Sequence, residues 1–102
     1  MRFEAIIATT EEDAYGYSFN QADLAQLAKD APGQPVTLFF DREICRVTEA
    51  RAEPDRVKIW CEAERTAAGL YAIPQWHDEK IVGVGLVRVP LDPFLTPVKE
   101  VP

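Results

Sequence analysis

The chain has 102 residues, 47% of them hydrophobic and 27% charged, which is the size and composition of one globular domain with a single core. Its formal net charge of -6, without any run of Lys or Arg, argues against nucleic-acid binding, which requires cations to neutralise phosphates. Its apolar stretches fall far short of the roughly 20 residues that span a bilayer, so we expect no membrane partner and a cytoplasmic location.

A strand over 2–10 and a short helix over 21–30 are the first predicted elements. Asn20 can cap the helix, and Asp23 at the third helical position completes a variant of the capping box. Phe19 and Leu24 stand at the spacing of a hydrophobic staple, and Ala31-Pro32-Gly33 ends the helix. Because so short a helix is marginal alone, we expect it to pack on a sheet.

The rest of the chain is dominated by strand patterns. Glu53-Pro54-Asp55-Arg56 suits a type I turn and therefore predicts a hairpin. We expect a mainly β, α+β fold, either a small β-barrel or a strongly bent antiparallel sheet, with one short α-helix. The predicted strands after the helix cover 36–40, 44–52, 56–64, 70–73 and 81–89.

The register of this hairpin predicts which side chains share a face. With the turn centred between Pro54 and Asp55, the numbers of opposed residues sum to 109. Cys61 then belongs to the core face, while Cys45, Val47 and Trp60 belong to the opposite one. The two cysteines would lie on opposite faces, so we predict no disulfide between them; a slip of one residue would reverse the assignment.

The last segment, VPLDPFLTPVKEVP, is rich in proline, which excludes a regular helix or a central strand. We therefore divide the chain into a β-rich domain over 1–90 and an extended arm over 91–102. Folding of the arm back over its own barrel is the alternative to its reaching a neighbouring subunit.

No catalytic constellation stands out. Ser18, the sole serine, precedes the helix cap, where hydroxyls commonly bond local backbone groups. Cys61 falls on the predicted core face and resembles a small hydrophobic residue, although a hydrolase using Cys61 with His77, or a carboxylate site, is an alternative. Glu62 and Glu64 suit a solvated strand face. A small barrel that binds a ligand is a third hypothesis.

Metal and cofactor sites are not predicted either. A structural zinc site takes about four ligands, whereas this chain offers two cysteines and one histidine. The segment IVGVGL lacks the third glycine and the helix of a phosphate-binding loop, so its glycines suggest a bulge or a close approach instead.

Apolar side chains in excess of what one small domain buries are the strongest functional signal. Aromatic anchors of this kind are typical of interface cores, so we predict a non-enzymatic protein that associates with itself or docks on a larger assembly. The candidate interface residues are Val47, Trp60, Tyr71, Trp76, Leu91, Phe94, Leu95 and Val98.

The order of a strand, YGYSF, a short helix, PGQPVTLFFD, ICRVTEA and RVKIWCEAE resembles the front of the bacteriophage prohead maturation proteases, a family with a herpesvirus-protease-like β-barrel. The resemblance covers 3–64 and, more loosely, 81–89. In that family the strand matching 36–40 leads to a catalytic histidine and a later strand supplies a serine. Here Phe39, Phe40 and Asp41 stand at the first place, Cys45 stands where glycine is usual, and 81–87 has no serine. The resemblance thus implies a barrel without the activity, as a component of a phage or prophage particle.

Overall fold

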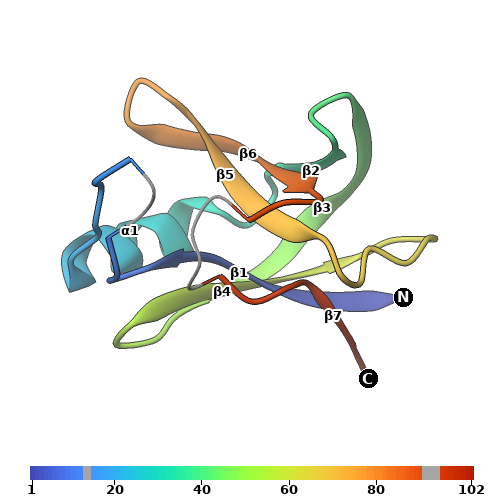
Figure 1. The fold of residues 1–102 in the computed structure, drawn as a ribbon, viewed down its shortest axis with the longest axis horizontal. Coiled ribbons are helices and arrows are strands. Elements are labelled where there is room, and N and C mark those ends of the chain that lie inside the picture. The colour runs from blue at the N-terminus through green and yellow to red at the C-terminus, as the bar shows by residue number, and fades with distance from the viewer. Residues whose placement is uncertain (13–14, 91–94) are drawn as a thin grey trace.

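The computed structural model describes residues 1–12, 15–90 and 95–102, which form one α-helix and one sheet of seven strands (Figure 1). The sheet curls strongly into a half-barrel, so the predicted mainly β, α+β fold class is confirmed. The helix is α1 (Gln21–Asp30) and the strands are β1 (Arg2–Thr9), β2 (Pro35–Leu38), β3 (Arg42–Ala52), β4 (Arg56–Glu62), β5 (Tyr71–His77), β6 (Lys80–Val87) and β7 (Lys99–Val101).

The strands follow the order β5-β6-β2-β3-β4-β1-β7 across the sheet. The long strand β3 joins its two halves, because β3 pairs with β2 near its start and with β4 near its end. One pair departs from the predicted antiparallel arrangement, since β2 and β6 are parallel. Parallel strands need a long connection, and here β3, β4 and β5 all lie between the two in sequence.

Helix α1 has the predicted bounds and the predicted cap. The Asn20 side chain accepts a hydrogen bond from the Asp23 backbone N–H at 2.8 Å, and the Asp23 carboxylate accepts one from the Asn20 N–H at 3.0 Å. Leu24 and Leu27 are buried and face the sheet beside β3 and β4, which is the packing that stabilises so short a helix. No helix in the described part of the chain is long and apolar enough to cross a membrane.

The hydrophobic core fills the concave side of the half-barrel, between the sheet and α1. Its members come from both halves of the sheet and from the helix, so the described residues share one core. The largest fully buried side chains are Phe3, Leu24, Val36, Val57, Ile59 and Val84.

The β3–β4 hairpin follows the predicted register from its turn as far as the pair of Glu49 and Trp60. The Glu53 N–H donates to the Arg56 carbonyl at 2.8 Å, and Ala52 pairs with Val57 as predicted. Further along, Val47 rather than Thr48 faces Cys61, because a bulge shifts the register between Val47 and Glu49. A bulge adds one residue to one strand and so turns every later side chain to the opposite face.

The predicted placement of Val47 and Cys45 on the outer face is therefore wrong. Val47 is 3% exposed and belongs to the core, and Cys45 is half-buried against it. Thr48 is exposed, and its hydroxyl donates to the Trp60 carbonyl at 3.0 Å, which stabilises the bulge.

The described end of the chain, residues 95–102, folds back on the same sheet. The Val98 N–H donates to the Leu70 carbonyl at 2.7 Å, and the Val98 side chain is 3% exposed. Strand β7 then pairs antiparallel with β1. Two of the prolines predicted to keep this segment extended, Pro97 and Pro102, flank these contacts without interrupting them.

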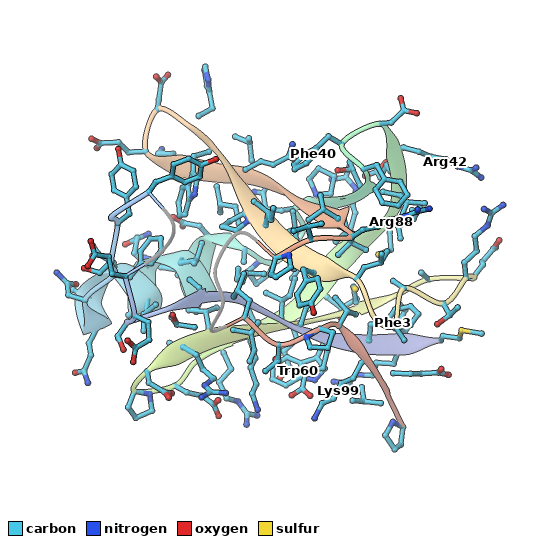
Figure 2. All side chains as sticks on the ribbon, in the orientation of Figure 1. Phe3, Phe40, Arg42, Trp60, Arg88 and Lys99 are labelled. Atoms are coloured by element: carbon cyan, nitrogen blue, oxygen red, sulfur yellow. The ribbon has the colours of Figure 1, made fainter. Side chains whose placement is uncertain are left out.

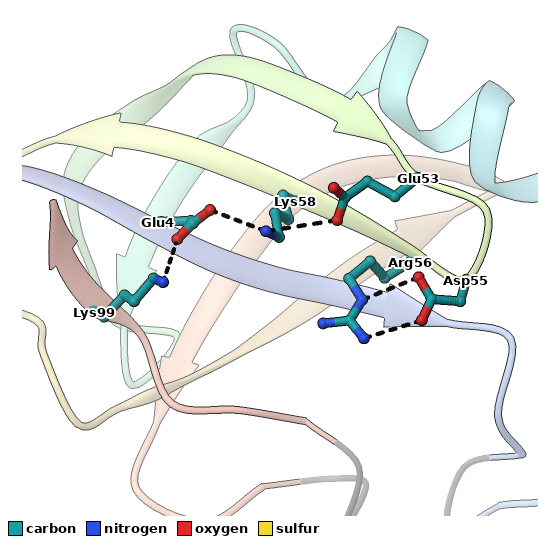
Figure 3. A network of polar contacts seen from close by, with 6 residues as sticks. All are labelled: Glu4, Glu53, Asp55, Arg56, Lys58 and Lys99. Carbon is teal, nitrogen blue, oxygen red and sulfur yellow. Dashed lines mark hydrogen bonds and ion pairs between the residues drawn. The ribbon is translucent and has the colours of Figure 1, made fainter.

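A polar network on the outer side of the sheet ties β7 to β1 and β4 (Figure 3). The Glu4 carboxylate lies 3.0 Å from the Lys99 Nζ and 3.4 Å from the Lys58 Nζ, which also lies 3.6 Å from Glu53. Burial by itself would raise the pKa of Glu4, but the hydrogen bonds and charges of the two lysines hold it below its usual value. The carboxylate therefore stays ionised at neutral pH.

Candidate functional site

The predicted interface residues fall in different environments. Val47 and Val98 are core residues, at 3% exposure each, and so contribute to the domain's own stability. Tyr71 and Leu95 are half-buried. Leu91 and Phe94 lie outside the described residues. Trp60 and Trp76 remain as candidates on the surface.

The two tryptophans lie on separate surfaces. Trp60 is half-buried on the outer face of β4, and the Arg51 guanidinium lies 5.5 Å from its ring centroid. Trp76 is 44% exposed near the end of β5 and stacks on Phe19, with 6.1 Å between ring centroids. They therefore do not form one interface.

The corner between β2 and β3 holds a feature that the sequence prediction missed. Phe39 and Phe40 have φ angles of 54° and 62°, and the Asp41 N–H donates to the Leu38 carbonyl at 3.1 Å. Two successive residues with positive φ closed by such a bond form a type I′ turn, which strongly prefers Asn-Gly. The strand that was predicted to continue through Phe40 ends at Leu38 instead. Bulky side chains in this conformation are strained.

Both phenylalanines are displayed at the surface, with 44% of Phe39 and 50% of Phe40 exposed. The Phe40 ring lies against Gly85, where any Cβ would collide with it, so this glycine provides the close approach expected within IVGVGL. Phe39 borders a shallow apolar hollow on the surface of β5 and β6. We call this surface the Phe39–Phe40 patch; it comprises Phe39, Phe40, Ile73, Val87 and Val89.

Unpaired charges of both signs surround the patch. The Arg88 guanidinium lies 5.4 Å from the centroid of the Phe39 ring, and Arg42 lies near Phe40 at the same end of the molecule (Figure 2). Asp41, Arg42 and Arg88 are exposed, and within the described ranges none of them forms an ion pair. Each charge is thus available to an outside group.

The two cysteines lie close together, because the bulge turns Cys45 toward the face of β4 that carries Cys61. A hydrogen bond between the two thiols is the main cause that lowers the pKa of Cys45, and the same contact raises the pKa of Cys61, which burial raises further. The inference that the two side chains lie on opposite faces is therefore wrong, although both thiols are free. Cys61, buried and hard to ionise, is a poor nucleophile.

Other chemically active side chains are dispersed. His77 is highly exposed, and its Nε2 lies 3.4 Å from the carboxylate of the neighbouring Asp78. Glu62 and Glu64 are exposed, as predicted for a solvated strand face. Among the described residues, no group of three or more His, Cys, Asp or Glu side chains is arranged to hold a metal ion.

Comparisons with known proteins identify no relative of this chain. No family model matches the sequence, and no curated protein or solved structure matches the chain.

Proposed function

We propose that this protein is a non-enzymatic interaction domain that associates with a second copy of itself through the Phe39–Phe40 patch. The observation that carries the proposal is the type I′ turn occupied by two exposed phenylalanines. Asn-Gly would form this turn with less strain and would expose less apolar surface. A strained conformation that displays apolar side chains is therefore explained better by binding than by folding.

Charge complementarity favours a second copy of the chain as the binding partner of the Phe39–Phe40 patch. In a two-fold symmetric dimer the same patch contributes to both sides, so it must be complementary to itself. The rim of the patch meets this condition, because unpaired Asp41 can face unpaired Arg88 of the other copy, twice by symmetry. Aromatic residues and arginine are also the residue types that dominate binding energy at interface centres.

The setting that we propose for this dimer is a phage or prophage particle, or the cytoplasm in which such particles assemble. Its support is the resemblance of the front of the chain to prohead maturation proteases, together with the absence of serine from 81–87. A barrel that has lost a protease's nucleophile can still serve as a structural protein that associates with other copies of itself.

The experiment compares the mass of the wild-type chain with that of Phe39→Asn by sedimentation equilibrium. We expect a wild-type dimer at tens of micromolar, and a dissociation constant raised about tenfold or more in the variant, since interface aromatics commonly contribute over 1 kcal/mol. Val82→Thr, at a residue that is 46% exposed outside the patch, is the matched control and should leave the dissociation constant unchanged. A monomeric wild type, or equal effects of the two substitutions, would refute the proposal.

The stability of Phe39→Asn separates loss of binding from loss of folding. Because Asn is favoured in a type I′ turn, the variant should unfold at the same or a higher urea concentration than wild type when both are monomeric. Weaker association with unchanged stability supports an interface role. Parallel loss of stability and association would mean that Phe39 serves the fold.

Charge reversal tests the symmetric arrangement. Arg88→Glu and Asp41→Arg should each weaken self-association, because each places like charges opposite one another. A mixture of the two variants should recover a dimer, since both pairs across the mixed interface then join opposite charges, one in the native order and one reversed. Failure of the mixture to associate more tightly than either variant alone would exclude the two-fold pairing.

A further inference from the structure

A cavity of about 530 Å³ lies between β1, α1 and β5 on the concave side of the half-barrel. Its volume falls within the range of roughly 300–1,000 Å³ that is usual for small-molecule sites. The floor is apolar and rigid, because its side chains are at most 3% exposed and belong to the core. These floor residues are Ile7, Ala8, Leu27, Ala72 and Ile81.

Aromatic side chains form one wall of the cavity. Phe19 and Trp76 stack with an interplanar angle of 27°. The segment before α1 therefore contributes one ring of the wall, and β5 contributes the other. Tyr15 and Tyr17 stand at the mouth and are largely exposed. The faces of such rings attract cations.

All the charged side chains among the described lining residues are acidic. Two of the carboxylates, Asp23 and Asp30, come from one side of α1, since residues seven apart share a helix face. Asp30 accepts a hydrogen bond from the Gln26 side chain at 2.9 Å, which holds its carboxylate in place and leaves further lone pairs for a ligand. None of the described lining residues is Lys, Arg or His. The lining carboxylates that belong to described residues are Glu11, Asp23, Asp30 and Glu79.

We propose that this cavity binds a small organic cation with an apolar tail, of the alkylammonium class. The tail would lie on the apolar floor, while the ammonium group would lie at the mouth between the aromatic wall and the carboxylates. Among the described lining residues, an anion with the same tail would meet four carboxylates and no compensating cation, so the site would discriminate by charge. This binding site goes beyond the proposed self-association and uses different charged residues.

Titration of the full chain with three probes of equal tail length tests the proposal. Hexylammonium, 1-hexanol and hexanoate are added at pH 7 and low salt, and binding is followed at the Trp76 indole N–H by two-dimensional NMR. We expect hexylammonium to bind about tenfold or more tightly than 1-hexanol, and hexanoate to bind least. Equal or tighter binding of hexanoate or 1-hexanol, or no response to hexylammonium at about 10 mM, would overturn the proposal.

Isosteric variants test the role of the carboxylates. Asp30→Asn and Glu79→Gln should each weaken hexylammonium binding by about two- to fivefold, the worth of a solvent-exposed ion pair, and leave 1-hexanol binding unchanged. Glu62→Gln is the matched control, because Glu62 is an exposed carboxylate on β4 outside the cavity lining. An equal loss in the control would show that net charge alone attracts the probe and would refute the site.

Discussion

Truncation of Val98 to Ala tests whether the C-terminal segment belongs to the core of its own domain. The side chain is 3% exposed beside Leu70, and the substitution removes two buried methyl groups without touching the backbone bonds that anchor the segment. At about 0.8 kcal/mol for each buried carbon, the transfer term is about 1.6 kcal/mol. The cavity left behind adds to this, so we expect a total loss of roughly 2–3 kcal/mol.

Urea unfolding followed by tryptophan fluorescence measures this loss at a protein concentration where the chain is monomeric, so that the Phe39–Phe40 patch is unbound. Under these conditions Val89→Ala provides a matched control. Val89 is 74% exposed, so the same truncation there should change the free energy of unfolding by less than about 0.5 kcal/mol. The slope of the transition should be equal in both variants. If Val98→Ala costs no more than Val89→Ala, or if it lowers the oligomeric mass at unchanged stability, the segment serves association and our reasoning is wrong.

Three further predictions follow from local contacts. Asn20→Ala should cost about 1 kcal/mol and Leu24→Ala roughly 2–5 kcal/mol in urea unfolding, and equal negligible losses would contradict a packed, capped helix. Glu4→Gln should destabilise the protein at pH 7. Because the folded pKa of Glu4 lies below its ordinary value of 4.5, this difference in stability should close as the pH falls through and below 4.5, and a constant difference would contradict the assignment. Cys61→Ala removes the hydrogen bond that lowers the pKa of Cys45, so the midpoint of iodoacetamide labelling of Cys45 should move to higher pH, and an unmoved midpoint would exclude that bond.

Elements that depend on neighbouring residues could be predicted from the sequence. The bounds of α1 follow from Asn20 and Asp23, whose reciprocal bonds span three residues, and the β3–β4 turn follows from Pro54, whose fixed φ suits its position. The mainly β class follows from alternating apolar residues in the same way. Each of these signals acts over a few residues and needs no information from the rest of the chain.

Features that depend on distant segments were decided only by the tertiary structure. The bulge at Thr48 lets Val47 and Cys45 reach the core, a gain of packing that outweighs the regular register predicted from the turn. Likewise, the high strand propensity of Phe39 and Phe40 favoured a continuing strand, whereas the parallel pairing of β2 with β6 and the space above Gly85 place them in a turn. The cavity is also assembled from β1, α1 and β5, so no single stretch of sequence carries its pattern. Local propensity is decided residue by residue, but register, strand pairing and cavities depend on which distant surfaces the fold brings together.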